Sequence, residues 1–274
     1  MTRGLLNDRN REAWQAAKEK DEALLVGYLV AGDPAREASL SMVRESVEAG
    51  IDVVELGVPG RRPEMDGPII QRAHKRALDG GMSDEEELLA YWRAIRQQVA
   101  VPFWAMGYKS DVVGSGLYKK LIREQLVDAL VLPDCTLEEQ VAIQQYTADF
   151  GVDIVRFINS AMDEETMKRV CDGATIIYAQ SYAGTTGDPL ANVSDLSQLC
   201  SRIRHYLPEG MIVSGFGLRT PKLVGEAVRS GFDGAVVGSA LVARCENQEN
   251  DYLYRMVAEM KMQTVRSNRE EESL

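Results

Sequence analysis

Short apolar runs alternate with amphipathic helical patterns along the whole chain. Eight of the runs are almost continuous in Val, Ile and Leu, which is typical of parallel strands that are covered on both faces. The pattern predicts strands at Leu24–Val30, Val53–Gly57, Phe103–Met106, Ala129–Leu132, Ile154–Ile158, Thr175–Ala179, Met211–Ser214 and Gly234–Val237.

The segments between these strands carry helix-start signals. Thr220 followed by Pro221 predicts an N-cap with proline at the first helical position. Capping-box spacing occurs twice, at Ser83 with Glu86 and at Thr136 with Glu139. A further apolar stripe with helical spacing consists of Leu196, Leu199, Cys200, Ile203 and Leu207.

A short sequence pattern that recurs along the chain supports a repeated βα unit. An apolar residue followed by Asp precedes a strand at Ile51-Asp52, Val127-Asp128, Val152-Asp153 and Phe232-Asp233. Such a repeat predicts the α/β class and a TIM (β/α)8 barrel. We expect one domain over residues 1–266, including an N-terminal helix, and a flexible charged tail over 267–274. A doubly wound open sheet is the alternative, but no GxGxxG follows the first strand.

Composition narrows the function. The 274 residues include 31 Lys and Arg against 42 Asp and Glu, a net charge of −11. This balance argues against a partner that is nucleic acid or an anionic membrane, because both need a basic face. With no long apolar run, no signal-peptide pattern and four widely spaced cysteines, we expect a cytoplasmic protein with reduced thiols. The two histidines, His74 and His205, lie far apart, so no zinc site is expected.

The carboxyl ends of the predicted strands are rich in glycine. In a barrel these ends form the active-site face. The sixth, seventh and eighth ends are followed by Gly184–Gly187, Gly215–Gly217 and Gly238-Ser239. Backbone N–H groups at such positions bind a phosphate dianion without Lys or Arg. Any one glycine could equally serve a turn, but the three together favour a phosphate site.

Two acidic residues stand out near the second strand. Glu55 lies at its end, and a carboxylate facing a barrel mouth is costly unless it is used or paired. Burial would raise its pKa and suit it to general acid/base work. Asp66 follows eleven residues later in a loop that could return over the mouth. The residues leave open whether Glu55 instead pairs with Lys or Arg and Asp66 is only a turn residue.

These motifs, in order and spacing, resemble the α subunit of tryptophan synthase over roughly residues 24–245. The segments that carry the resemblance are Gly32-Asp33-Pro34, Glu55-Leu56-Gly57-Val58-Pro59, Asp66-Gly67-Pro68, Gly184-Thr185-Thr186-Gly187, Gly215-Phe216-Gly217 and Gly238-Ser239. The resemblance implies a TIM barrel that cleaves indole-3-glycerol phosphate to indole and glyceraldehyde 3-phosphate in a retro-aldol reaction. It implies no cofactor or metal in this chain and a β subunit as partner.

The resemblance also implies residue roles. Glu55 would be the general acid/base, Asp66 would accept the indole N–H, and Tyr178 would line the site near Glu55. Thr186 would meet Asp66 when its loop closes. The implied phosphate ligands are Gly187, Gly217, Gly238 and Ser239, and the implied walls of the indole pocket are Tyr28, Tyr108, Phe157 and Phe216.

The chain departs from the family pattern in two loops. Gly60-Arg61-Arg62-Pro63 stands where the family usually has Phe-Ser-Asp-Pro, and Tyr108-Lys109-Ser110 stands where Tyr-Asn or Tyr-Asn-Pro is common. In the family these loops help to dock the β subunit, so the departures predict a lyase that works alone or with an unusual partner. One of the arginines could pair with Asp66, reach a substrate anion, or remain a solvated loop charge. The alternatives in function are a binding or regulatory protein of low activity and another phosphate-binding barrel enzyme, such as a sugar-phosphate isomerase.

Overall fold

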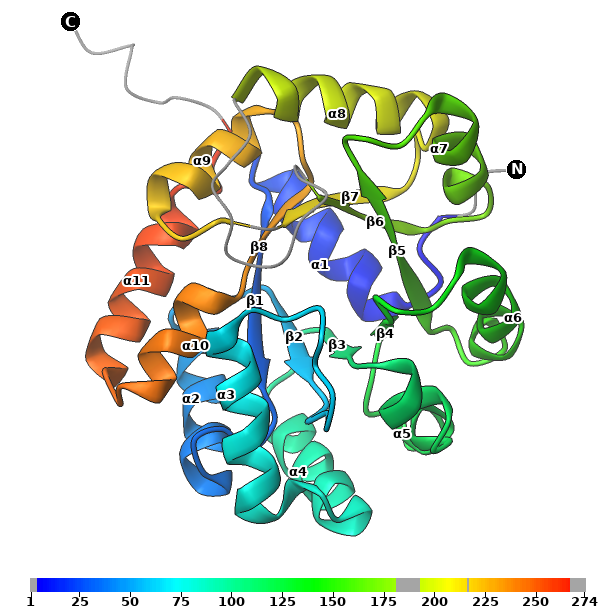
Figure 1. Cartoon of the computed structure of the whole chain (residues 1–274). Coiled ribbons are helices and arrows are strands. Elements are labelled where there is room, and N and C mark those ends of the chain that lie inside the picture. Colours follow the sequence, from blue (N-terminus) through cyan, green and yellow to red (C-terminus); the bar gives the residue numbers. More distant parts are fainter. Residues whose placement is uncertain (1–3, 181–192, 216, 267–274) are drawn as a thin grey trace, which may run out of the picture.

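The computed structural model describes residues 4–180, 193–215 and 217–266. Eight parallel strands close into a barrel in chain order, and helices form a ring around them (Figure 1). The fold is therefore the expected TIM barrel. The strands are β1 Leu24–Val30, β2 Val53–Gly57, β3 Phe103–Met106, β4 Ala129–Val131, β5 Asp153–Asn159, β6 Ile176–Gln180, β7 Met211–Gly215 and β8 Gly234–Val237.

Eleven α-helices and two short π-helical turns occur in the described part of the chain. The helices are α1 Asp8–Glu19, α2 Arg36–Glu48, α3 Pro68–Ala77, α4 Glu85–Gln98, α5 Leu117–Arg123, α6 Leu137–Ala148, α7 Glu164–Cys171, α8 Val193–Tyr206, α9 Pro221–Arg229, α10 Ser239–Glu246 and α11 Asn250–Met262, and the turns are η1 Leu78–Met82 and η2 Lys109–Val113. The tail expected over 267–274 lies outside the described residues.

All eight strands lie where the apolar runs predict them. The bounds of β1, β2, β3 and β8 agree to the residue; β4 and β7 differ by one residue at one end, and β5 and β6 by one residue at each end. Every strand residue is buried except at the ends of β5 and β6, where residues are half-buried. The continuous apolar pattern is explained by this double burial, with helices outside and the barrel core inside.

Two of the three predicted helix starts are confirmed. Thr136 forms a full capping box with Glu139, and the Thr220 side chain accepts a hydrogen bond from Leu223 N. The box predicted at Ser83 is wrong. Asp84 caps α4 instead, because its carboxylate accepts from the backbone N–H of two residues in the first turn. A carboxylate at that position also interacts favourably with the helix dipole. The stripe on α8 is buried as expected.

The repeated Asp pins strand starts at the amino end of the barrel. The carboxylate of Asp52 accepts from Leu25 N at 2.7 Å, that of Asp128 from Phe103 N at 2.7 Å, and that of Asp233 from Ile212 N at 2.8 Å. In each case the donor belongs to the preceding strand, and a nearby Lys or Arg pairs with the carboxylate. The repeat therefore stabilises the end of the barrel opposite the mouth. In barrels of this kind, residues at that end serve stability rather than catalysis.

Helix α1 covers that same end. Asn10 is buried, donates to Asp153 Oδ2 at 2.9 Å and accepts from Trp104 Nε1 at 2.9 Å. Arg156 is also structural, as its strand position suggests, because its guanidinium donates to Val170 O and Gln144 Oε1. These contacts leave the carboxyl ends of the strands as the open face of the barrel.

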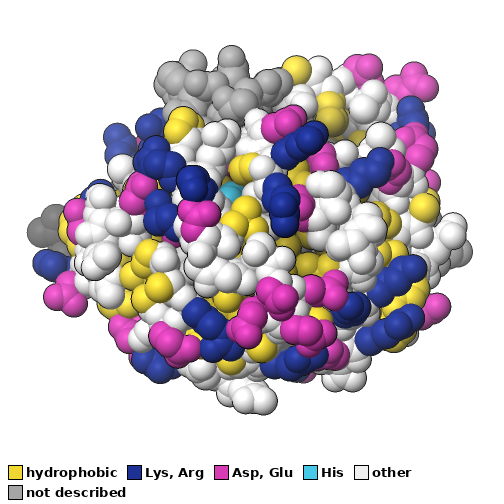
Figure 2. Space-filling model, turned by 60° about the horizontal axis from the view of Figure 1, so that its bottom comes forward, with side chains coloured by type: hydrophobic (Ala, Val, Ile, Leu, Met, Phe, Trp, Pro, Cys, Tyr) yellow, Lys and Arg dark blue, Asp and Glu magenta, His cyan; other side chains and the backbone are white. Residues whose placement is uncertain are grey.

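The surface carries both signs of charge. On the face seen in Figure 2, Lys and Arg side chains are interspersed with Asp and Glu, and no large area has one sign. Within the described residues, no helix combines the length and apolar character needed to cross a membrane.

Candidate active site at the barrel mouth

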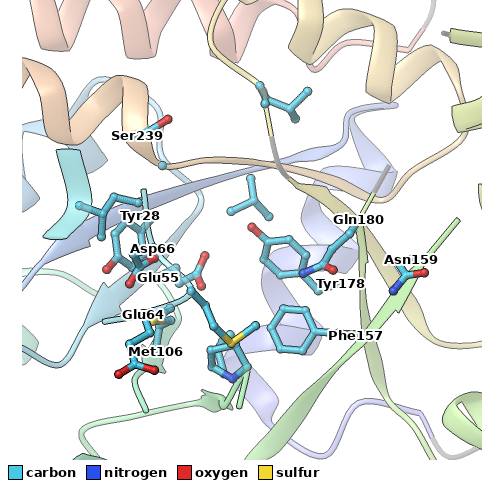
Figure 3. Close-up of a pocket in the computed structure, with 18 residues that line it drawn as sticks. Tyr28, Glu55, Glu64, Asp66, Met106, Phe157, Asn159, Tyr178, Gln180 and Ser239 are labelled. Atoms are coloured by element: carbon cyan, nitrogen blue, oxygen red, sulfur yellow. The ribbon is translucent and has the colours of Figure 1, made fainter. Parts of the chain in front are cut away.

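A pocket of about 470 Å³ opens at the carboxyl ends of the strands (Figure 3). Its polar lining includes Glu55, Asp66 and Ser239, and its apolar lining includes aromatic, Met, Val and Leu side chains from several strands. Such a mixture, mostly apolar with a few convergent polar groups, is typical of a small-molecule site. The location is the one at which barrels of this kind place their chemistry.

Glu55 projects from β2 into this pocket. It is paired in register with Tyr28 on β1 and Trp104 on β3, so the three side chains share the inner face of the barrel. Glu55 is only 4% exposed, and no described residue forms a hydrogen bond or ion pair with its carboxyl group. The structural ion pair that the sequence left open is therefore absent from the described part of the chain.

Burial and a neighbouring charge change the acidity of Glu55. Loss of solvation is the larger cause, and repulsion from Asp66 is the second; together they raise its pKa from 4.5 to about 8. The carboxyl group is thus mostly protonated at neutral pH. A neutral acid that can become a base near pH 8 is suited to proton transfer.

Asp66 lies in the loop before α3 and is buried. Its Oδ2 accepts a hydrogen bond from Tyr108 Oη at 2.8 Å, and its backbone carbonyl accepts one from Gln71 Nε2 at 2.7 Å. Arg61 and Arg62 are exposed and form no ion pair with a described residue, so neither neutralises Asp66. Asp66 is held by neutral donors, which leaves its negative charge available to a ligand.

Three aromatic side chains that the sequence analysis singled out line the pocket. Phe157 and Tyr178 pack with ring centroids 5.2 Å apart, and Tyr28 lies on the side of Glu55 (Figure 3). Burial raises the pKa of Tyr28 and of Tyr178 well above the usual value, so both hydroxyls stay protonated. Gly215 leaves room for the ring of Tyr178, because a Cβ atom on residue 215 would lie 2.1 Å from that ring.

The expectation for Tyr108 differs from the structure. Tyr108 is buried but does not line the pocket; its hydroxyl contacts Asp66 instead. The loop after β3 turns the ring toward the Asp66 loop, and a buried tyrosine hydroxyl needs a hydrogen-bond partner. Burial and the Asp66 charge raise the pKa of Tyr108, so it remains a donor.

Gly217, Gly238 and Ser239 also line the pocket. Gly217 has φ +85°, a conformation that favours glycine, and Ser239 is the first residue of α10. No Lys or Arg belongs to the lining among the described residues. The backbone N–H groups at the amino end of α10 are therefore the groups of the described lining that are suited to bind an anion. The predicted residues Thr186, Gly187 and Phe216 lie outside the described residues.

Several pocket residues escaped the sequence reasoning. Glu64, Met106, Asn159 and Gln180 also line the pocket. His74, which the sequence suggests is an ordinary polar helix residue, is buried beside Asp66. Its position eight residues after Asp66, on a helix that starts at Pro68, was the available signal. No group of three or more His, Cys, Asp or Glu side chains among the described residues is arranged to hold a metal ion.

Comparisons with known proteins agree on one family. The family model described as tryptophan synthase alpha chain matches residues 14–271. The tryptophan synthase alpha chain of Methanosarcina mazei is 32% identical over 262 residues, which cover 94% of each chain. That of Gluconacetobacter diazotrophicus is 34% identical over 258 residues, covering 90% of this chain and 93% of the relative.

Solved structures share the fold over nearly the whole chain. A chain from Aquifex aeolicus superposes with a TM-score of 0.84 at 29% identity and covers 96% of this chain and 99% of its own. A chain of tryptophan synthase from Mycobacterium tuberculosis superposes with a TM-score of 0.82 at 26% identity, and the match covers 92% of this chain and 96% of the other. The similarity thus extends over nearly the full length of both sequence and fold.

Proposed function

This chain belongs to the tryptophan synthase alpha chain family, and from that premise we propose that it is a carbon–carbon lyase. Its substrate would be indole-3-glycerol phosphate, and its products indole and glyceraldehyde 3-phosphate. The observation that carries the proposal is the buried carboxyl group of Glu55, which has no partner among the described residues and a pKa of about 8, in one pocket with Asp66, Gly238 and Ser239.

The geometry supports a division of labour within the pocket. The phosphate would bind the backbone N–H groups around Gly238 and Ser239, and the indole would lie against Phe157 and Tyr178. Asp66 would then accept a hydrogen bond from the indole N–H. Binding at both ends orients the substrate and avoids an entropic cost during the reaction.

The proton transfers follow from the state of Glu55. In its neutral form Glu55 donates a proton to C3 of the indole ring, and Asp66 stabilises the positive charge that develops at the ring nitrogen. The resulting Glu55 carboxylate accepts the proton of the side-chain hydroxyl next to C3. The carbon–carbon bond then breaks, its electron pair restores the aromatic ring, and the hydroxyl carbon becomes the aldehyde. Glu55 ends protonated, ready for the next turnover.

The partner of this chain is a separate proposal. Proteins of this family normally pair with a tryptophan synthase β subunit. We propose that this chain works alone or with an unusual partner, because Arg61 and Arg62 are exposed in a loop that departs from the family pattern. Co-purification with a standard β subunit, together with strong stimulation of indole release, would contradict this.

An indole-release assay on the purified chain tests the proposed activity. Wild-type protein should release indole from indole-3-glycerol phosphate, while Glu55→Gln and Asp66→Asn should lose turnover by at least about 100-fold. Both variants should retain the phosphate contacts and therefore bind substrate. Glu165→Gln, an exposed glutamate on α7, is the matched control and should match wild type. A wild-type protein that binds the substrate without releasing indole would exclude the lyase.

A further inference from the structure

His74 is a buried ionisable side chain beside Asp66 that the proposed mechanism does not use. It lies on α3, is 1% exposed, and its Nε2 is 3.4 Å from Asp66 Oδ2. The same nitrogen is 3.4 Å from Tyr28 Oη. A polar ring in such a position costs free energy unless its nitrogens have partners.

The other ring nitrogen fixes the tautomer. The backbone N–H of Gly60 donates to His74 Nδ1 at 3.0 Å. A neutral imidazole that accepts on Nδ1 carries its proton on Nε2. The Nε2–H group therefore donates to Tyr28 Oη at 3.4 Å, and it lies 3.4 Å from Asp66 Oδ2, which it attracts electrostatically. The main chain of Gly60 thus sets which nitrogen of His74 is the donor.

Helix α3 holds Asp66 at two points. Gln71 and His74 are three residues apart on α3, on one face of the helix. Gln71 Nε2 donates to the Asp66 backbone carbonyl, while His74 faces the carboxylate. Tyr108 binds the same oxygen, Oδ2. No described residue forms a hydrogen bond with Oδ1, so Oδ1 is the oxygen left for a ligand.

We propose that His74 is a positioning residue for the lyase reaction. Its Nε2–H group attracts Oδ2 of Asp66 electrostatically, Tyr108 donates a hydrogen bond to the same oxygen, and the two together present Oδ1 to the N–H group of the indole. This inference rests on the proposed function, since it assigns Asp66 to the indole nitrogen. It adds that the Gly60 loop controls the direction of the Asp66 carboxylate through His74.

Two substitutions separate positioning from simple packing. In His74→Asn, the amide oxygen can accept the Gly60 N–H, but no donor reaches Asp66. In His74→Gln, the amide nitrogen reaches the place of Nε2, but the acceptor for Gly60 is lost. Positioning predicts that His74→Asn lowers kcat/KM about 10-fold, the lower end of the effect of losing a polar contact with a charged group. His74→Gln should stay within about 3-fold of wild type.

The reverse order, with Gln damaged and Asn near wild type, would show that His74 only anchors the Gly60 loop and would overturn the proposal. A second test combines the substitutions of His74 and Asp66 in one protein and compares its kcat/KM with those of the single variants. In an Asp66→Asn background, His74→Asn should cause no further loss, because the two residues act as one unit. Losses that multiply would also refute it. If His74→Asn does not fold, His74→Gln decides alone: near-wild-type activity supports positioning, and a 10-fold loss refutes it.

Binding of an uncleavable ligand distinguishes failure of this inference from failure of the lyase. The probe is indole-3-propanol phosphate, which lacks the side-chain hydroxyls, compared with its N-methyl form in calorimetry. His74→Asn should weaken the N–H ligand about 10-fold and leave the N-methyl ligand unchanged. Equal weakening of both ligands overturns the His74 inference. Selective weakening without indole release by wild type keeps it and excludes the lyase, and no binding by wild type overturns both.

Discussion

Replacement of Glu55 by Gln should abolish turnover and stabilise the fold. Glu55 is buried without a described partner, and its pKa is raised from 4.5 to about 8. A raised carboxyl pKa means that the folded state binds a proton which the unfolded state releases. The free energy of unfolding therefore falls as pH rises from about 4.5 to about 8, where the folded group also ionises.

The magnitude follows from the interval between 4.5 and 7. Each pH unit in that interval costs about 1.36 kcal/mol, so keeping Glu55 buried at pH 7 costs about 3 kcal/mol. Gln has nearly the same shape and no charge to lose. Glu55→Gln should thus raise the free energy of unfolding by about 3 kcal/mol at pH 7 and by less than about 1 kcal/mol at pH 5.

Denaturant unfolding of both proteins from pH 5 to pH 9, combined with the indole-release assay, measures these effects. Gain of stability with loss of turnover is expected where a strained group performs the chemistry. A stability difference that does not change with pH would refute the reasoning, since it would show that Glu55 ionises in the folded protein as it does in the unfolded chain. Glu165→Gln again serves as the control.

Three further outcomes are expected. The kcat/KM of wild type should decrease above about pH 8, because the neutral form of Glu55 donates the first proton; a flat profile to pH 9 would contradict this. Tyr108→Phe should lower kcat/KM about 10-fold or more through loss of its hydrogen bond to Asp66, with little change in melting temperature. Ser239→Asp should raise KM for the phosphorylated substrate at least 10-fold while α10 stays stable, because a carboxylate at a helix start suits the fold but repels a dianion; unchanged KM would place the phosphate elsewhere.

The arrangement of strands could be predicted because it depends on local pattern. Strands β1, β2, β3 and β8 begin and end where their apolar runs do, since burial on both faces permits hardly any polar residue inside a strand. The repeated Asp was visible in the sequence, but its role was not. Its hydrogen bond to the preceding strand joins residues 21 to 27 positions apart.

The candidate site was predicted only in part. Glu55 could be identified as a residue of interest from its place at a strand end. Whether it has a partner depends on every side chain that the closed barrel brings to the mouth, and no local pattern contains that information. The predicted Ser83 cap shows the same limit at short range, because two adjacent residues could cap the helix and Asp84 formed the bonds.

Apolar periodicity and motif spacing settled the barrel, the family resemblance and the two carboxylates. Tertiary contacts determined the state of those carboxylates. Closure of the barrel removes water from Glu55 and raises its pKa, and it brings Tyr108 and His74 from separate loops and helices onto Asp66. Proton affinity and hydrogen-bond direction depend on solvation and on neighbours distant in sequence, so they arise only when the chain is folded.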